Sequence, residues 1–348
     1  MIGSAFRVAV AVAAGLFPTI GIADGVSDFY KSKPLTILVG YGPGGGFDIT
    51  ARILARYYGA HIPGNPTVVV ENMPGGGGMR VANYLYSVAP KDGSVIGTFI
   101  ADVAMEPLMG NENAKFSAER FSWIGSMTSD INSCGVWKGA GRGIRTFEDV
   151  LKGGTPVIFG SSGPQSVTSK YPLFMKNVLG APIRVVTGFK GTQDAMLALQ
   201  RGEIDALCGL QESSVGGAYW SDFQSGNLNI FVQLGMDRKS ALFTEATQLS
   251  QLVRAKGDDE ALQVAEIVFG PHDISRPFAG PPDVPAERLV ALRKALIETM
   301  ADPGMVETGK KIKMDWNPMT GEEVQANLTK YYQTPKAIVA KSVALTKE

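Results

Sequence analysis

The sequence predicts an α/β protein of two doubly wound α/β domains with a cleft between them. The chain has 348 residues, more than one hydrophobic core usually serves, so two domains are expected. Short apolar runs rich in β-branched residues alternate with helical segments, as in sheets whose strands are joined by helical crossovers. In each half of the chain, one of these strands leads into a bend of small residues and then into a helix.

The first of these bends follows a predicted strand at 35–39. Residues 40–46 are mostly glycine and predict a loop, and a helix is expected from Asp48 to about Gly59. A strand that enters a helix through such a bend leaves backbone N–H groups at the helix N-terminus, where the helix dipole favours an anion. We therefore expect a ligand at this first turn.

Two interpretations of the first turn stay open on these residues. Gly40, Gly42 and Gly45 satisfy the G-x-G-x-x-G pattern of dinucleotide-binding folds, and Glu71 would be the acid that binds the ribose. Against this, Pro43 removes an N–H that a pyrophosphate would use, and the chain has no G-x-x-x-x-G-K-[ST]. The alternative is a carboxylate or similar small anion held by a few amides.

The chain continues with a strand at 67–71, a glycine-rich bend at 74–78, a helix at 79–88 and a strand at 94–100. This alternation predicts a parallel sheet with right-handed crossovers. Ligands of such sheets bind beyond the carboxyl ends of the strands. By that rule Asp102, directly after the third strand, faces the same cleft as the first turn.

The chain is expected to cross into the second domain at 121–130, where the first strand spans 134–137. A later strand at 156–159 enters a bend of serine and glycine that repeats the arrangement of the first turn. Serine hydroxyls and backbone amides can bind carboxylate oxygens without a full positive charge. The candidate residues of this second turn are Ser161, Ser162, Gly163, Gln165 and Ser166.

The remaining elements are predicted from the same patterns. Strands are expected at 183–187, 206–208 and 228–234, helices at 192–200 and 286–300, and a return to the first sheet through 267–270 or 277–280. Thr146 with Asp149, and Thr320 with Glu323, form capping boxes that open helices. The second box opens a terminal helix that is expected to run to about residue 346, with a bend at Pro335.

Residues 1–23 have the layout of a secretory signal peptide. Arg7 precedes an apolar core at 8–17, and Gly21 and Ala23 are small residues at the positions that a signal peptidase requires, so cleavage is predicted after Ala23. The apolar core is too short to cross a bilayer, which needs about 20 residues. The mature protein is therefore expected to be exported and not inserted into a membrane.

Composition argues against several classes of function. The formal net charge of zero is unlike that of a nucleic-acid-binding domain. The chain has two histidines and lacks H-E-x-x-H, C-x-x-C and G-x-S-x-G, so metal hydrolysis and acyl transfer lack their usual residues. We expect no enzyme, no cofactor and no metal, although an enzyme with paired carboxylates stays open. Cys134 and Cys208 could form one disulfide in an oxidising compartment, or stay two buried thiols.

Several motifs are spread over nearly all of the chain after the leader. They are Pro43-Gly44-Gly45-x-x-Asp48-x-x-Ala51-Arg52, Val70-Glu71-Asn72-x-Pro74 with the glycines that follow, Ala89-Pro90-Lys91-Asp92-Gly93, Phe189-Lys190-Gly191, Gly202-x-x-Asp205 and Ala279-Gly-Pro-Pro-Asp-Val-Pro285. Together they resemble the solute receptors of tripartite tricarboxylate transporters, the Bug family. The resemblance implies a periplasmic binding protein of the type II kind, whose two domains clamp an organic acid and hand it to a membrane permease.

The resemblance also implies roles for individual residues. Asp48 would orient a water that contacts the ligand, and the strands that carry Cys134 and Cys208 would be neighbours. The chain departs from the family at Thr168-Ser169-Lys170, where relatives often have a histidine, and at 331–335, where they typically have acidic residues. Recognition of the far end of the ligand is therefore expected to differ.

The predicted function is capture of a di-, tri- or aromatic carboxylate by domain closure, and the protein is expected to act as a monomer. Residues 24–130 and 256–348 would form the first domain and 131–255 the second. The alternatives are a dinucleotide-dependent oxidoreductase and an exported sensor. The two turns would hold one carboxylate, and Asp102, Phe189, Lys190 and Gln211 would select the rest. The candidate ligand-binding residues are Tyr41, Gly42, Gly44, Gly45, Gly46, Phe47, Asp48, Asp102, Ser161, Ser162, Gly163, Gln165, Ser166, Phe189, Lys190, Gly191 and Gln211.

Overall fold

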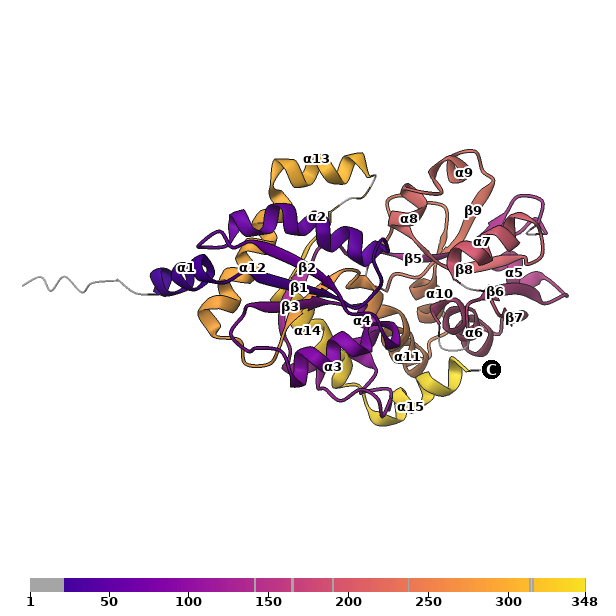
Figure 1. Cartoon of the computed structure of the whole chain (residues 1–348). Coiled ribbons are helices and arrows are strands. Elements are labelled where there is room, and N and C mark those ends of the chain that lie inside the picture. Colours follow the sequence, from indigo (N-terminus) through magenta and orange to yellow (C-terminus); the bar gives the residue numbers. More distant parts are fainter. Residues whose placement is uncertain are drawn as a thin grey trace, which may run out of the picture.

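The computed structural model describes residues 22–140, 142–163, 166–189, 191–236, 238–312, 314 and 316–347. Nearly all of the predicted signal peptide lies outside these residues, as do Gln165 and Lys190. The described chain forms two six-stranded sheets with helices on their faces, one at each end of the molecule (Figure 1). The predicted class of two α/β domains is confirmed.

The first sheet has the strand order β12-β4-β11-β3-β1-β2. Its strands are β1 (Leu35–Val39), β2 (Val68–Asn72), β3 (Val95–Thr98), β4 (Ser122–Ser126), β11 (Pro277–Gly280) and β12 (Met319–Thr320). The strands β1, β2 and β3 pair in parallel, as the alternation of strands and helices predicted. The sheet as a whole is mixed, because β11 and β12 return from the second domain, where β11 pairs antiparallel with β3 and β4 and β12 pairs antiparallel with β4.

Helices cover both faces of the first sheet (Figure 1). One face carries α1, α2, α12 and α13, and the other carries α3, α4 and α14. Their apolar faces bury side chains such as Leu54 and Leu296 on one side and Val81 and Leu328 on the other. The helices are α1 (Ile22–Ser32), α2 (Gly46–His61), η1 (Gly76–Gly78), α3 (Met79–Ser87), α4 (Ala101–Met105), η2 (Ala118–Arg120), α12 (Ala286–Ala301), α13 (Pro303–Lys311) and α14 (Gly321–Tyr332).

The second sheet has the order β10-β9-β5-β8-β6-β7, in which β5 is antiparallel to both β8 and β9. Its strands are β5 (Asn132–Trp137), β6 (Val157–Ser161), β7 (Ile183–Thr187), β8 (Ala206–Gln211), β9 (Leu228–Gln233) and β10 (Thr247–Gln248). Its shorter helices are α5 (Phe147–Lys152), α7 (Thr192–Gln200), α8 (Glu212–Gly216), α9 (Trp220–Gln224), α10 (Leu249–Ala255) and η3 (Gly270–Asp273). Both predicted capping boxes are present, at the starts of α5 and α14.

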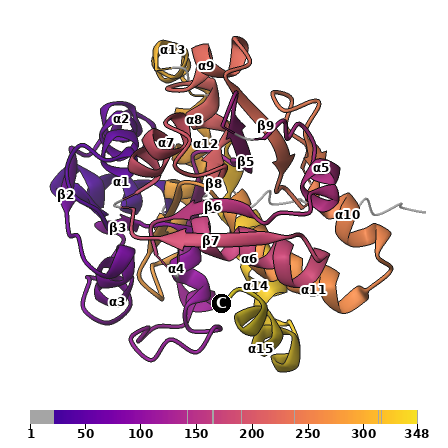
Figure 2. The ribbon, with the colours of Figure 1, turned by 90° about the vertical axis from the view of Figure 1, so that its right-hand side faces the viewer.

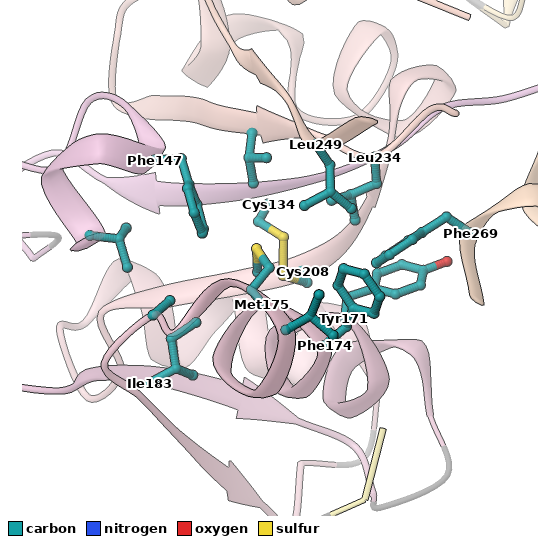
Figure 3. Packing of buried hydrophobic residues seen from close by; sticks show 14 of the residues in the cluster. Cys134, Phe147, Tyr171, Phe174, Met175, Ile183, Cys208, Leu234, Leu249 and Phe269 are labelled. Carbon is teal, nitrogen blue, oxygen red and sulfur yellow. A yellow bond between two sulfur atoms is a disulfide. The ribbon is translucent and has the colours of Figure 1, made fainter. Parts of the chain in front are cut away.

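Cys134 and Cys208 form a disulfide between the adjacent strands β5 and β8, with an S–S distance of 2.02 Å (Figure 3). Of the two alternatives for these cysteines, the bridge is the one observed. Both residues are fully buried among apolar side chains that include Phe174 and Leu249. The bridge therefore lies inside the core of the second sheet.

Three helices at the junction complete the core of the second sheet, and two of them come from the C-terminal third of the chain. These are α6 (Val167–Leu179), α11 (Asp259–Phe269) and α15 (Lys336–Leu345), which lie together in Figure 2. Phe174 of α6 packs edge-on against Phe269 of α11, with ring centroids 4.9 Å apart, and Ile338 of α15 joins the same cluster. Residues 256–348 thus contribute to both sheets.

Of the two alternatives for the return to the first sheet, 277–280 is the one observed, as β11, while 267–270 end α11 and begin η3. One prediction for the C-terminal third needs correction. The single terminal helix is two helices, α14 and α15, separated at 333–335. Pro335 precedes α15 as its N-cap residue and has no N–H to continue the hydrogen bonds of α14.

Candidate functional site

The three parallel strands of the first sheet end side by side, and Tyr41 connects the loops that follow them. Its hydroxyl donates to the carbonyl of Gly77 at 2.9 Å and accepts the N–H of Ile100 at 3.2 Å. These residues follow β1, β2 and β3 respectively. Tyr41 therefore holds three segments together at one edge of the first sheet: the first turn, the second glycine-rich bend and the start of α4. Ligands of parallel sheets bind at this edge.

Asp48 lies inside the first turn and is buried. Its Oδ2 accepts the N–H of Gly44 at 2.8 Å, and its carboxylate binds Arg52 Nε at 3.0 Å and Asn72 Nδ2 at 2.8 Å. Asn72 also donates to the carbonyl of Tyr41 at 3.0 Å. The bond from Arg52 is the main reason that the pKa of Asp48 falls to about 2, and the bonds from Gly44 and Asn72 add to it. Asp48 thus holds the turn in shape, and Arg52 is engaged with it.

The glycines of the first turn leave its backbone accessible. Gly42, Gly44, Gly45 and Gly46 are exposed, and Gly44 has a φ of +80°, a conformation that favours glycine. Gly45 is the N-cap of α2 and supplies no side-chain cap. The first N–H groups of a helix have no intrahelical acceptor, so those of Gly46 and Phe47 are available to an anion.

Arg276 lies directly behind the first turn, and the sequence reasoning missed it. It is only 8% exposed, and its guanidinium lies 4.6 Å from the centroid of the Phe47 ring. The Phe47 ring in turn stacks on Tyr41 with centroids 4.6 Å apart. The only local signal was a Ser-Arg pair immediately before the buried strand β11, which is an unusual place for a charge.

Asp130, in the crossing segment, lies near Arg276 and faces the second domain. It is buried and accepts hydrogen bonds from the hydroxyl and N–H of Ser213 and from the N–H of Ile131. Burial raises the pKa of its carboxyl, while the hydrogen bonds from Ser213 and the charge of Arg276 act in the opposite direction. Gln211 ends β8 just before Ser213, so the structure brings this candidate to the junction of the two domains.

The serines of the second turn bind mainly one another. Ser161 is fully buried, and its Oγ lies 2.6 Å from Ser169 Oγ, 3.0 Å from Thr168 Oγ1 and 3.1 Å from Ser166 Oγ. The N–H of Ser162 donates to Thr168 Oγ1 at 3.1 Å. These bonds fix the start of α6 against the end of β6. Ser161 therefore supports the turn, while Ser162, Gly163 and Ser166 are at least partly exposed.

A cavity of about 650 Å³ lies between the two domains. The first domain lines it with Gly76, Gly77 and Asp102, and the second with Ser166 and Lys170. Asp102 and Ser166, which sequence reasoning assigned to one cleft, thus line the same cavity. Behind them the buried His272 places its Nε2 3.3 Å from Asp102 Oδ1, and burial lowers the pKa of His272.

Two opposite charges act on Tyr41. Burial is the main reason that the pKa of its hydroxyl rises to about 12, while the hydrogen bond from Ile100 and the charge of Arg276 act against this and the charge of Asp102 adds to it. The edge of the first sheet therefore carries a cation and an acid that both act on Tyr41. The first turn itself does not line the 650 Å³ cavity.

Neither Phe189 nor Gly191 lines the 650 Å³ cavity. Phe189 packs over Gly160 and lines a separate cavity of about 390 Å³ with Asp194 and Arg201. Gly191 is the N-cap of α7. Across the described ranges no cluster of His, Cys, Asp and Glu side chains has the arrangement of a metal site, and no helix there is both long and apolar enough to span a bilayer.

No family model matches the chain. A curated relative, the "UPF0065 protein in the TAR-I ttuE-ttuC' intergenic region" of Agrobacterium vitis, is 30% identical over 205 residues, covering 58% of this chain and 57% of that one. The "UPF0065 protein in gbd 5'region" of Cupriavidus necator is 39% identical over 83 residues, covering 24% and 23%. The chain thus spans at most a little over half the length of these curated relatives.

Solved structures of solute-binding proteins share the fold over nearly the whole chain. A TctC solute-binding protein from Polaromonas is 21% identical with a TM-score of 0.68, covering 90% of this chain and 99% of its own. MatC of Rhodopseudomonas palustris, with bound malate, is 15% identical with a TM-score of 0.58, covering 90% and 99%. Another R. palustris protein, with adipate, is 16% identical with a TM-score of 0.60, covering 90% and 97%. The partial sequence similarity is thus to UPF0065 proteins, and the fold is that of TctC and related solute-binding proteins, the proteins that the motifs of the chain resemble.

Proposed function

We propose that this protein is a periplasmic solute receptor that binds a small organic acid between its two domains and delivers it to the permease subunits of a tripartite transporter. The observation that carries the proposal is the first turn. Asp48, bound to Gly44, Arg52 and Asn72, fixes a glycine loop at the N-terminus of α2, where unpaired N–H groups and the helix dipole favour a carboxylate.

The ligand class rests on the relatives as well as on the site. The two R. palustris structures contain malate and adipate, which are both dicarboxylates. In this chain one carboxylate would lie at the first turn, with Asp48 orienting a bridging water. The rest of the ligand would extend toward the cavity of Asp102 and Ser166, with Gln211 at the junction. Phe189, Lys190 and Gly191 would contact it only after the domains close.

Closure would be a hinge motion about the segments that join the domains. We assign residues 24–130 and 256–348 to the first domain and 131–255 to the second, except that α11 and α15 pack in the core of the second sheet and would move with it. The closed form would be the one that the permease recognises. The leader supports export, with cleavage after Ala23.

A binding screen tests this function. Malate, succinate, adipate, citrate and benzoate are each added to the purified mature protein, and the melting temperature is followed, with NADH as the comparison. A ligand at 100 times its dissociation constant stabilises by about 2.7 kcal/mol, which gives a clear shift. At least one acid should raise the melting temperature. A shift with NADH and none with any acid would favour the oxidoreductase alternative instead.

A second experiment tests export. N-terminal sequencing of the protein recovered from the periplasm should give Asp24 as the first residue. Recovery of the uncleaved chain from the cytoplasm would contradict this part of the proposal.

A further inference from the structure

Arg276 is a buried cation for which no ion pair or hydrogen bond to an acid is found among the described residues. Its side-chain Nε is buried and has no hydrogen-bond partner, and its Nη1 binds only the carbonyl and hydroxyl of Ser275, at 3.0 and 3.1 Å. Asp130 is the acid whose charge acts on it, but that carboxylate is bound by Ser213 and Ile131. Burial lowers the pKa of Arg276, which nevertheless stays charged, as arginines do in proteins.

An unpaired buried charge is costly, and proteins normally compensate it with an ion pair. The neutral groups of Ser275 satisfy part of the guanidinium but supply no negative charge. The charge of Asp130 offsets part of this cost without a direct bond, so the guanidinium retains donors that an anion could accept. Planar guanidinium groups are well suited to bind carboxylates, because two N–H groups can bond two oxygens at once.

The position of the guanidinium shows where that anion would lie. Nη2 is 3.5 Å from the point that a Cβ on Gly46 would occupy, and the group lies over the ring of Phe47. Gly46 and Phe47 are the first residues of α2. The full charge of Arg276 and the positive end of the helix dipole thus coincide at one place, beside a glycine that leaves room for a ligand.

We infer that Arg276 is a ligand-binding residue, which pairs with the carboxylate that the first turn receives. The inference rests on the proposed function and adds a specificity to it: the group bound at this turn must be ionised. A neutral amide or ester of the same shape would leave the guanidinium unpaired and would bind far more weakly. Tyr41 and Phe47 form the apolar wall that keeps this ion pair away from water.

The test measures binding to Arg276→Gln, Arg276→Lys and Arg238→Gln by calorimetry. The probes are the tightest-binding acid of the panel above and the corresponding amide. The wild-type protein should prefer the acid by at least about 100-fold. Arg276→Gln should weaken acid binding at least about 30-fold and reduce the preference to a few-fold, because the amide loses little. Arg276→Lys should recover part of the acid affinity and part of the preference for acid over amide.

Arg238→Gln is the matched control, because Arg238 lines a different cavity between the domains and contacts Ser129 and Glu212. It should bind the acid as the wild type does. If Arg276→Gln bound the acid as tightly as the wild type and kept the same preference for acid over amide, the inference would be overturned, while the receptor function would stand. Should Arg276→Gln fail to fold, the wild-type preference for acid over amide and its reduction in Arg276→Lys decide the matter. If no acid binds the wild type, the proposed function fails and the inference with it.

Discussion

The carboxylate of Asp48 accepts the N–H of Gly44 at 2.8 Å, four residues earlier in the chain. In the proposed site a carboxylate side chain could repel an acidic ligand, but the negative charge of Asp48 is buried and neutralised by Arg52. The same hydrogen bond occupies the N–H of Gly44 and fixes the position of the backbone N–H groups that follow it. The acid therefore shapes the anion site without opposing it.

Replacing Asp48 by Asn should destabilise the fold by about 2 kcal/mol, because Arg52 and Gly44 lose a charged partner. Urea unfolding of the mature protein measures this. Asp28→Asn is the control, since Asp28 and Lys31 form an exposed pair with side chains 73% and 63% accessible. That substitution should cost less than about 0.5 kcal/mol. Equal costs for the two variants would contradict the role given to Asp48.

The stabilisation by Asp48 should depend on pH in a defined direction. Its pKa is about 2 in the folded protein, below the ordinary value of 3.8, so the folded state favours the ionised form. The difference in free energy of unfolding between wild type and Asp48→Asn should be constant above about pH 5 and shrink as the pH falls toward 2. Urea titrations at pH 6, 4 and 3 check this. If the difference in free energy of unfolding between the two proteins grew on acidification, the predicted direction of the pH dependence would be wrong.

Removing the disulfide should destabilise the protein by about 2–4 kcal/mol, because the bridge joins residues 74 positions apart and restricts the unfolded chain. The double variant Cys134→Ala, Cys208→Ala is compared with the wild type in urea. Adding a reductant should weaken the wild type and leave the double variant unchanged. A loss below about 1 kcal/mol would mean that the bridge contributes little beyond packing.

Gly45→Val should abolish ligand binding while leaving the fold intact. Gly45 has a φ of −77°, and a Cβ there would lie 3.6 Å from the carbonyl of Gly42, an ordinary contact. A branched side chain would nevertheless cover the N–H groups at the start of α2. The melting temperature without ligand should change little, and the shift with acid should vanish. An undiminished shift would contradict the site.

At Gly44, by contrast, a substitution should affect stability through the backbone conformation. Its φ of +80° is strained for any residue with a Cβ, so Gly44→Ala should cost about 1–2 kcal/mol of stability even though nothing lies within 4 Å of the added atom. Unfolding of Gly44→Ala and Gly45→Val is measured without ligand. A loss of stability in Gly44→Ala alone would indicate backbone strain, whereas Gly45→Val should lose binding with little loss of stability. Equal stability of Gly44→Ala and wild type would argue against this backbone conformation.

Local chemistry explains what could be predicted from the sequence. The strand, bend and helix around Gly42 follow from apolar, β-branched residues next to glycines, and the capping boxes at Thr146 and Thr320 from side chains three residues apart. Pairing of Asp48 with Arg52 follows from one helical turn of separation. These features depend on neighbours in the chain, and the structure contains each of them.

Long-range contacts explain what could not be predicted. Arg276 reaches the first turn from the position just before β11, more than 200 residues later, and no local pattern connects it to Phe47. The antiparallel pairing of β11 and β12 depends on how the chain returns from the second domain. The roles of Gln165 and Lys190 stay predictions, since both lie outside the described residues.

The helices α11 and α15 have a consequence for any attempt to study the second lobe alone. A recombinant fragment of residues 131–255 would carry every strand of its sheet, yet it would lack the side chains of Val264, Phe269 and Ile338 that cover Phe174 and its neighbours. Such a fragment would expose an apolar surface and tend to aggregate. A fragment that folds alone would need α11 and α15 as well, so the structural unit around the second sheet is discontinuous in the sequence.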